Sequence, residues 1–150
     1  MQEIPRTLLQ GWAVLIVDDE EDSLEVAQIV LESHGASVFT AHNGQDAIHL
    51  ARRLKPHFII SDLSMPLMDG WDFISSMQRD AALRDIPVIA LTAHSIPGFR
   101  ERAVGAGFHN YLTKPLTATT FIHDLVVLLV DVSTGPSLIL EEPVRLRKSA

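Results

Sequence analysis

The chain has 150 residues, which suits one domain, and 47% of them are hydrophobic, which excludes a mainly disordered chain. Its 19 acidic and 12 basic residues give a net charge of −7, so the clustered positive charge of nucleic-acid-binding proteins is missing and we expect no nucleic-acid partner. The lack of cysteine excludes disulfides and thiol catalysis, and the longest apolar run, 125–130, is shorter than the roughly 18 residues of a membrane span. We therefore expect a cytoplasmic protein with no membrane partner.

From Trp12 onward, short apolar runs alternate with segments of helical period. The apolar runs predict five strands, at about 13–17, 37–41, 58–62, 87–91 and 109–112. The periodic segments predict five helices, at about 23–34, between Asn43 and Pro56, around 71–77, at about 97–106, and from Thr117 to near Val132.

Capping signals predict where some of these helices begin and end. Asp22 and Glu25 suit a capping pair at the start of the first helix, and Gly35 suits the position just past its end. Asn43 suits the cap of the second helix, and Thr117 suits the cap of the last.

The alternation of strands with helices predicts an α/β fold, because parallel strands are joined by right-handed crossovers. Five such units predict a doubly wound parallel sheet with helices on both faces, although the alternation does not itself fix the strand order. We expect an N-terminal extension at 1–11, one domain at 12–132, and a C-terminal tail at 133–150 that is too short for an output domain.

Polar residues follow four of the five predicted strands. Asp18 and Asp19 follow the first strand, Asp62 ends the third, Thr92 follows the fourth, and Lys114 lies two residues past the fifth. Ligands bind outside the carboxyl ends of the strands in such sheets, so we expect these residues at one edge. Three carboxylates repel one another unless a cation joins them, and Mg²⁺ prefers oxygen ligands. The pattern therefore predicts a site for a metal ion and a phosphate group.

Each of these residues has an ordinary structural explanation when it is taken alone. An aspartate at a strand end is a common turn former, and threonine is a common strand residue. It is their coincidence at four strand ends that favours a functional site.

Four motifs at these strand ends resemble the signature of response-regulator receiver domains of two-component systems. They are Val17-Asp18-Asp19, Asp62-Leu63-Ser64-Met65-Pro66-Leu67-Met68-Asp69-Gly70, Leu91-Thr92-Ala93 and Lys114-Pro115. The intervals between the motifs match as well, and the resemblance covers about 13–132. It implies a flavodoxin-like sheet in the order 2-1-3-4-5.

The resemblance implies that Asp62 is the phosphoacceptor, which receives a phosphoryl group from a phosphohistidine donor. It implies that Asp18 and Asp19 hold Mg²⁺ or Mn²⁺ together with Asp62, and that the backbone carbonyl of Ser64 completes the protein's ligands.

The resemblance also assigns roles around the phosphoryl group. Lys114 would bridge this group and Asp62, and Thr92 would turn inward to bond a phosphoryl oxygen. The side chain of Tyr111 would turn inward after that of Thr92. Ala93 matches the small residue that leaves room for the phosphoryl group.

Two flanking positions, Ser64 and His94, are those that tune how fast receivers lose the phosphoryl group; an ordinary surface histidine is the other explanation for His94. The expected partners are a sensor histidine kinase or a histidine phosphotransfer protein, and a downstream protein target. The expected protein is thus a stand-alone signalling phosphoacceptor, not an enzyme that acts on other substrates.

We expect the surface formed by the fourth and fifth strands and their helices, residues 97–106, 109–112 and 117–132, to change on phosphorylation. A phosphoryl group adds roughly two negative charges and new acceptor oxygens, which only one arrangement of the Thr92 loop can bond.

The last predicted helix carries more apolar residues than one helix face can bury. They are Phe121, Ile122, Leu125, Val126, Val127, Leu128, Leu129 and Val130. Either the tail covers the surplus through Leu138-Ile139-Leu140, or the surplus forms a partner or homodimer interface.

Other functions fit these residues less well. A phosphohydrolase of the haloacid dehalogenase type needs an aspartate two residues after its nucleophile, where this chain has Ser64. A flavin carrier needs a Ser-, Thr- and Gly-rich loop after the first strand, where this chain is acidic. A phosphate-independent docking module remains a third alternative, because an intact site need not be used.

Overall fold

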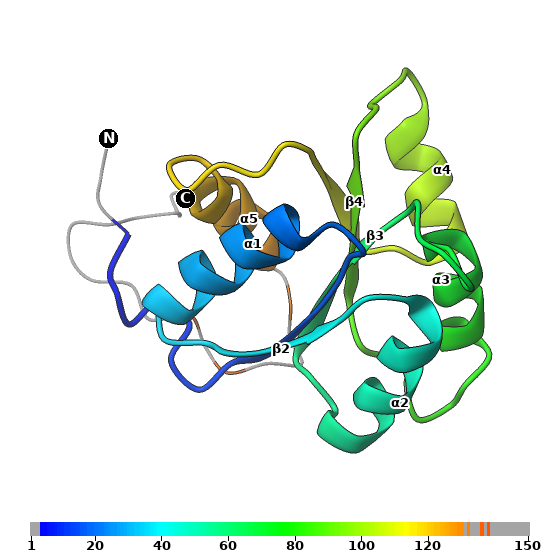
Figure 1. Cartoon of the computed structure of the whole chain (residues 1–150), viewed down its shortest axis with the longest axis horizontal. Helices are drawn as coiled ribbons and strands as arrows, with labels where there is room; N and C mark the ends of the chain where they lie inside the picture. Colours follow the sequence, from blue (N-terminus) through cyan, green and yellow to red (C-terminus); the bar gives the residue numbers. More distant parts are fainter. Residues whose placement is uncertain (1–3, 131, 133–135, 137, 139–150) are drawn as a thin grey trace.

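The computed structural model describes residues 4–130, 132, 136 and 138. Its strands are β1 (Ala13–Val17), β2 (Ser37–Ala41), β3 (Phe58–Asp62), β4 (Val88–Thr92) and β5 (Asn110–Thr113). Its helices are α1 (Glu21–Ser33), α2 (Gly44–Leu54), α3 (Gly70–Gln78), α4 (Phe99–Ala106) and α5 (Phe121–Leu129) (Figure 1). Within these residues, no helix has both the length and the apolar character that crossing a bilayer requires.

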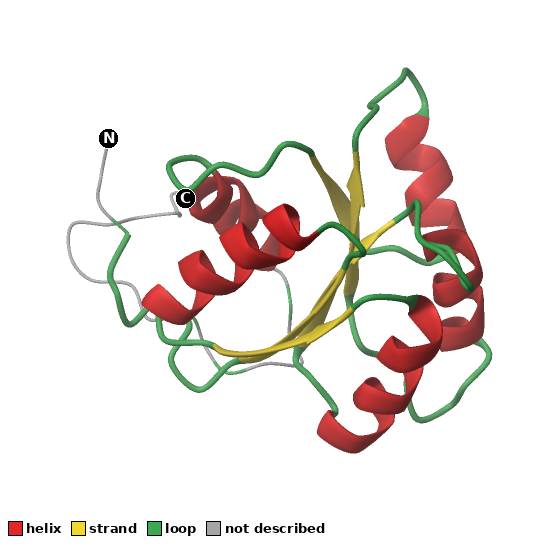
Figure 2. Ribbon diagram, viewed as in Figure 1, coloured by secondary structure: helices red, strands yellow, loops and turns green. Residues whose placement is uncertain are grey.

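The strands form one parallel sheet in the order β2-β1-β3-β4-β5. This order confirms the flavodoxin-like arrangement that the resemblance implied. Helices α1 and α5 cover one face of the sheet, and α2, α3 and α4 cover the other (Figures 1 and 2). The fold is therefore the predicted doubly wound α/β sheet.

Successive side chains of each central strand enter different cores. In β1, Val14 and Ile16 pack on the side of α1 and α5, whereas Leu15 and Val17 pack on the opposite side. All residues of β3 and β4 are buried. Burial on both faces explains why the apolar runs in the sequence are continuous and do not alternate with polar residues.

Two predicted helix boundaries are confirmed. The Asn43 side chain accepts a hydrogen bond from the backbone nitrogen of Asp46 at 2.9 Å, at the start of α2. Gly35 follows α1 with a φ of +98°, and a Cβ atom there would lie 3.0 Å from the backbone nitrogen of Gln10. Glycine at this position therefore permits both the left-handed conformation and the close approach.

The predicted capping pair of the first helix is wrong. Helix α1 begins at Glu21, so Asp22 and Glu25 lie inside it, and the Glu20 side chain at the cap position makes no capping hydrogen bond. The backbone nitrogen of Glu20 instead donates to Asp18 Oδ1 at 2.9 Å. A turn around Asp18 therefore sets the start of the helix.

Helix α5 begins later than predicted. The residue before the helix is Thr120, because the helix starts at Phe121, although Thr117 Oγ1 accepts a hydrogen bond from the Thr120 nitrogen at 3.3 Å. Thr117 Oγ1 lies 2.6 Å from Thr120 Oγ1, and its carbonyl accepts a hydrogen bond from the Phe121 nitrogen. Threonine hydroxyl groups that bond locally offer an alternative to the helix, and a turn precedes α5 for this reason.

The apolar surplus of α5 is divided between the core and the surface. The buried members are Phe121, Ile122, Leu125, Val126 and Leu129. Val127 and Val130 are 64% and 55% exposed. Leu138 of the tail packs against the same core, which favours the covering explanation for part of the surplus; Ile139 and Leu140 lie outside the described residues.

Residues before the first strand belong to the core as well. Leu8 and Leu9 are fully buried and Trp12 is 1% exposed. The Leu9 nitrogen donates to the carbonyl of His34 at 2.8 Å, just past the end of α1. The segment before β1 thus closes the amino-terminal edge of the sheet beneath α1.

Candidate functional site

The predicted polar residues meet at the carboxyl edge of the sheet. Val17 of β1 pairs with Ser61 of β3. The residues that follow them, Asp18 and Asp62, are therefore neighbours. Asp18 and Asp62 are 0% and 5% exposed, and Thr92 at the end of β4 is 8% exposed. Among the residues that the structure describes, these are three of the four polar residues that are buried. Buried polar side chains are therefore concentrated at this edge of the sheet.

Three carboxylates form one acidic cluster at this edge. Asp18, Asp19 and Asp62 each place an oxygen within 4.8 Å of the others. Asp18 Oδ2 is buried and accepts no hydrogen bond from a described residue, although Lys114 Nζ lies 3.1 Å away. Converging oxygens with an unsatisfied buried acceptor suit a hard divalent cation such as Mg²⁺. The donor set therefore fits the predicted metal.

The acidic cluster makes Asp62 an unusually weak acid. Burial and the negative charge of Asp18 raise its pKa from 3.8 to about 6. The Lys114 ammonium and the backbone N–H of Ser64 oppose this shift only in part. Asp62 Oδ1 also accepts a hydrogen bond from the Leu63 nitrogen at 2.9 Å, which fixes the orientation of the carboxylate.

Lys114 is the cation of this site. Its Nζ lies 3.4 Å from Asp62 Oδ2 and 3.3 Å from Asp18 Oδ1, and it contacts Glu20 Oε1 more closely still. Burial by itself lowers the pKa of Lys114, but its contacts with Glu20 and Asp18 outweigh burial and raise the pKa above its usual value. The lysine is therefore charged across the physiological pH range.

The loop after β3 is held close to the site by Gly70. A Cβ atom at this position would overlap the Asp62 carbonyl oxygen and lie 2.7 Å from Leu63 Cα, so only glycine fits. Within the loop, Leu67 has a φ of +69° and is flanked by a hydrogen bond from the Met68 nitrogen to the Pro66 carbonyl at 2.7 Å. This is a γ-turn, a strained conformation found at functional sites. The predicted carbonyl ligand, Ser64, lies in the same loop.

Thr92 is engaged by the loop that follows it. Its Oγ1 donates to the His94 carbonyl at 3.0 Å and accepts from the His94 nitrogen at 3.2 Å. The next residue, Ser95, hydrogen bonds to the Tyr111 hydroxyl at 3.0 Å. Ala93 and His94 are exposed. Four of the predicted residues, Thr92, Ala93, His94 and Tyr111, therefore lie at one loop, and Ser95 links that loop to Tyr111 although the sequence did not single it out.

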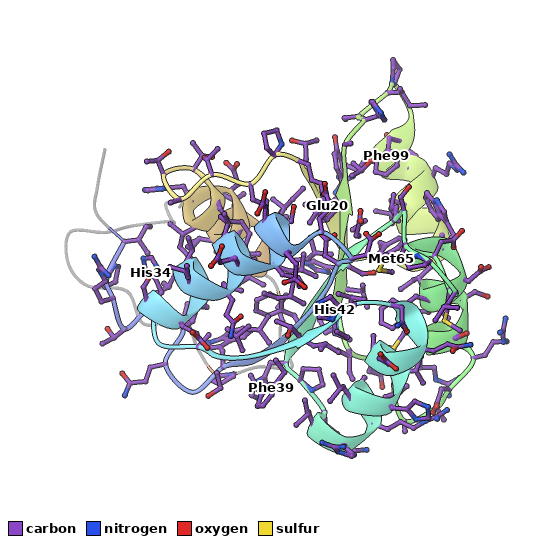
Figure 3. All side chains as sticks on the ribbon, in the orientation of Figure 1. Glu20, His34, Phe39, His42, Met65 and Phe99 are labelled. Atoms are coloured by element: carbon purple, nitrogen blue, oxygen red, sulfur yellow. The ribbon has the colours of Figure 1, made fainter. Side chains whose placement is uncertain are left out.

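Glu20 is a member of the site that sequence reasoning missed. It lies at the start of α1 (Figure 3) and shares Lys114 with Asp18 and Asp62. The hydrogen bond from Lys114 lowers the pKa of Glu20. The available signal was its position directly after Asp18 and Asp19. The sequence does not show that the Lys114 side chain reaches Glu20, and this contact is what makes Glu20 part of the site.

Comparison with known proteins gives one consistent family. Residues 14–126 match the family model described as the response regulator receiver domain. The polar-differentiation response regulator DivK of Brucella anthropi is 33% identical over 119 residues, which make up 79% of this chain and 97% of that protein.

Solved structures agree with this sequence match. The chemotaxis response regulator CheY4 of Vibrio cholerae superposes with a TM-score of 0.74 and 28% identity, covering 80% of this chain and 100% of that one. The receiver domain of sensor histidine kinase PA1611 of Pseudomonas aeruginosa, solved with a magnesium ion coordinated in its active-site cleft, has a TM-score of 0.68 and 29% identity over 79% of this chain and 95% of its own.

Proposed function

This chain belongs to the family of response regulator receiver domains of two-component signalling, and from that premise we propose that it accepts a phosphoryl group on Asp62. One observation carries the proposal. The carboxylates of Asp18, Asp19 and Asp62 converge within 4.8 Å, and the Lys114 ammonium lies 3.4 Å from Asp62. Such a set of charges can hold a cation and a transferred phosphoryl group together.

In the proposed transfer, an Asp62 oxygen attacks the phosphorus of a phosphohistidine. The P–N bond of the donor breaks, its electron pair stays on the imidazole nitrogen, and a P–O bond forms on Asp62. A pKa of about 6 leaves most of Asp62 ionised at neutral pH, as a nucleophile must be. When water later attacks the phosphorus, the P–O bond breaks and the carboxylate returns. The protein thus acts only on its own phosphoryl group, as a signalling phosphoacceptor.

Asp18, Asp19 and Asp62 would hold Mg²⁺ or Mn²⁺, together with the backbone carbonyl of Ser64. A bound divalent cation offsets the repulsion among the carboxylates and the phosphoryl oxygens. The magnesium ion that the PA1611 receiver holds in its active-site cleft supports this assignment.

The remaining residues would respond to the phosphoryl group. Lys114 would bond to one phosphoryl oxygen. Thr92 would leave its hydrogen bonds with the His94 backbone to bond to another, in the room beside Ala93. Because Ser95 follows His94 and bonds to Tyr111, this exchange would also release the tyrosine.

The readout surface would consist of α4, β5 and α5. Tyr111 and the loop before α4 join the site to this face, and Val127 of α5 is exposed there at 64%, available to a target or to a second copy of the chain. We expect hydrogen–deuterium exchange of α4 to change on phosphorylation. Equal exchange rates with and without the phosphoryl group would contradict this readout.

Receiver domains act with histidine kinases or histidine phosphotransfer proteins and with downstream targets. For this chain we propose one such phosphoryl donor in the cytoplasm and an output through protein contact, from a receiver domain at 12–132. Rate tuning by Ser64 and His94, which flank the site, is part of the same proposal.

The test is intact-mass spectrometry after incubation with acetyl phosphate and Mg²⁺. We expect one added phosphoryl group, which disappears in Asp62→Asn and in the presence of a chelator. A folded, Mg²⁺-binding protein that gains no phosphoryl group would favour the phosphate-independent docking module instead.

A further inference from the structure

We propose that Glu20 is a positioning residue that competes with the incoming phosphoryl group for Lys114 and so restrains phosphorylation. This inference rests on the proposed function of Asp62. The observation behind it is that the closest partner of the Lys114 ammonium among the described residues is Glu20, not the phosphoacceptor.

A phosphoryl group on Asp62 would share Lys114 with carboxylates that it already bonds. An ammonium has three N–H donors. Two of them go to Glu20 Oε1 and Asp18 Oδ1, while Asp62 Oδ2, at 3.4 Å, is an ion-pair partner without a hydrogen bond. The third N–H donor makes no hydrogen bond to a described residue, so a phosphoryl group on Asp62 would share the ammonium with Glu20 and Asp18, and its contact should strengthen when one of these is weakened.

Glu20 is the partner that can leave. Its side chain is 62% exposed, whereas that of Asp18 is fully buried. Among the described residues, its side chain otherwise makes only a long hydrogen bond with Ser23 Oγ, at 3.4 Å, and no capping bond to α1. Water can replace Lys114 around Glu20 but not around Asp18, so the exchange would occur at Glu20.

The negative charge of Glu20 should also weaken the binding of a phosphoryl group, as its contact with Lys114 does. Glu20 is the third carboxylate that contacts Lys114, beside Asp18 and Asp62. An acyl phosphate brings further negative charge to the same place. Glu20→Gln keeps the shape of the side chain, removes this charge and weakens its hold on Lys114, so a phosphoryl group should bind more tightly.

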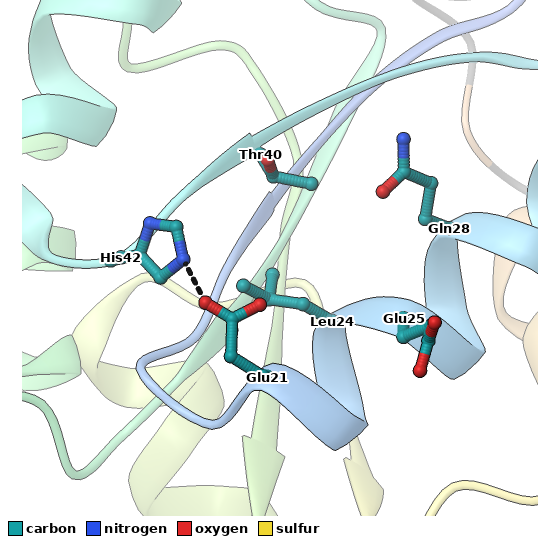
Figure 4. Close-up of a pocket in the computed structure, with 6 residues that line it drawn as sticks. All are labelled: Glu21, Leu24, Glu25, Gln28, Thr40 and His42. Atoms are coloured by element: carbon teal, nitrogen blue, oxygen red, sulfur yellow. Dashed lines mark hydrogen bonds and ion pairs between the residues drawn. The ribbon is translucent and has the colours of Figure 1, made fainter.

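The chain offers a matched control in the adjacent residue. Glu21 also lies in the first turn of α1, but its side chain pairs with His42 at 2.8 Å across the groove between α1 and the end of β2 (Figure 4). Glu21→Gln therefore removes the same charge from the same turn without touching the partners of Lys114.

The experiment measures the apparent Kd of fluoroberyllate, a stable mimic of an acyl phosphoryl group, by calorimetric titration at saturating Mg²⁺. It compares the wild type with Glu20→Gln and Glu21→Gln. The Kd of Mg²⁺ alone is measured for each protein, because a general structural effect or a loss of a metal ligand would change it.

We expect Glu20→Gln to lower the fluoroberyllate Kd about two- to five-fold, the upper part of the range for a partly exposed ion pair, with the Mg²⁺ Kd not raised. Glu21→Gln should change the fluoroberyllate Kd less than about two-fold. Equal or weaker fluoroberyllate binding by Glu20→Gln would overturn the inference, and so would an equal gain in Glu21→Gln. Failure of the wild type to bind fluoroberyllate would instead contradict the proposed function itself.

Discussion

Asp62 combines two properties that usually exclude each other, burial and negative charge. Its pKa of about 6 shows that the site favours the ionised carboxylate much less than water does. Burial and the proximity of Asp18 are the causes. The fold therefore maintains a poorly solvated carboxylate at the end of β3, and any cation or reaction that neutralises its charge is favoured.

This acidity predicts a characteristic dependence of stability on pH. The folded protein holds the Asp62 proton up to a pH of about 6, whereas the unfolded chain loses it near 3.8. Between these values the folded state binds more protons, so the contribution of Asp62 to the free energy of unfolding falls as pH rises and stays low above pH 6.

Asp62→Asn should therefore stabilise the metal-free protein at pH 7.5, by about 1–2 kcal/mol. The gain should shrink towards pH 4, where Asp62 is neutral in the folded state and only about half ionised in the unfolded chain. Urea unfolding with a chelator at both pH values checks this. The exposed Glu101→Gln on α4 serves as the control, and a gain of the same size at both pH values would refute the explanation.

Lys114→Met should separate phosphoryl binding from metal binding. The change removes the cation that contacts Asp18, Glu20 and Asp62 and leaves the three carboxylates of the acidic cluster. We expect fluoroberyllate affinity to fall more than about ten-fold, as for a buried charged hydrogen bond, while Mg²⁺ affinity is not reduced. Calorimetry of both ligands checks this, with Lys55→Met as the surface control. Unchanged fluoroberyllate affinity would show that Lys114 has no role.

Much of the candidate site could be predicted, because parallel strands end at one edge. Asp18, Asp62 and Thr92 each lie at or just past an apolar run, and topology brings them together. Glu20 and Ser95 could not be predicted in this way. Their roles depend on contacts with side chains from distant parts of the chain. Glu20 contacts Lys114, and Ser95 hydrogen bonds to Tyr111.

At the scale of elements, aromatic contacts join β5 to α4 and α3. The centre of the Phe99 ring of α4 lies 5.0 Å from that of Tyr111 and 6.1 Å from that of Trp71 of α3, and both pairs are edge to face. Arg102 of α4 lies 4.5 Å from the centre of the Trp71 ring. Each such contact stabilises the pair by about 0.5–1.5 kcal/mol. A movement of Tyr111 would therefore disturb the packing of α4 on α3.

Trp71 should report this movement. In a Trp12→Phe variant, which leaves Trp71 as the single tryptophan, fluoroberyllate with Mg²⁺ should shift the emission spectrum. In Trp71→Phe, the remaining Trp12 is buried in the core on the side of α1 and α5, packed against Phe58, and should give little change. A response from Trp12 alone would contradict coupling through Phe99.

The positions of the elements were predictable, whereas some of their ends were not. The short apolar-rich segments of the sequence located β1, β2 and β3 without error. The starts of α1 and α5 differed because Asp18 and Thr117 form local hydrogen bonds that the apolar period does not reveal.

At the scale of the whole molecule, the core extends beyond the alternating elements. Leu8 and Leu9 are fully buried in the cluster beneath α1 and α5, and Leu138 packs against that cluster from the other end of the chain. The apolar pattern of 4–11 is too short to predict this burial. The segment before β1 thus contributes to the stability of the sheet.

Leu9→Ala should lower the free energy of unfolding by about 2–4 kcal/mol, because it leaves a cavity in a closed core. Ile29→Ala is the control, since that side chain is 58% exposed on α1, and it should change stability by less than about 1 kcal/mol. Urea unfolding monitored by circular dichroism measures both. Equal effects of the two changes would show that the segment is not part of the cooperative unit.

The central claim is that Asp62 itself carries the phosphoryl group, and borohydride trapping tests it most directly. Reduction of an aspartyl phosphate converts that aspartate to homoserine, which peptide mass spectrometry can locate. After treatment with acetyl phosphate and Mg²⁺, we predict homoserine at position 62 and unmodified Asp18 and Asp19. Homoserine at either of those positions, or at none in a protein shown to be phosphorylated, would contradict the claim.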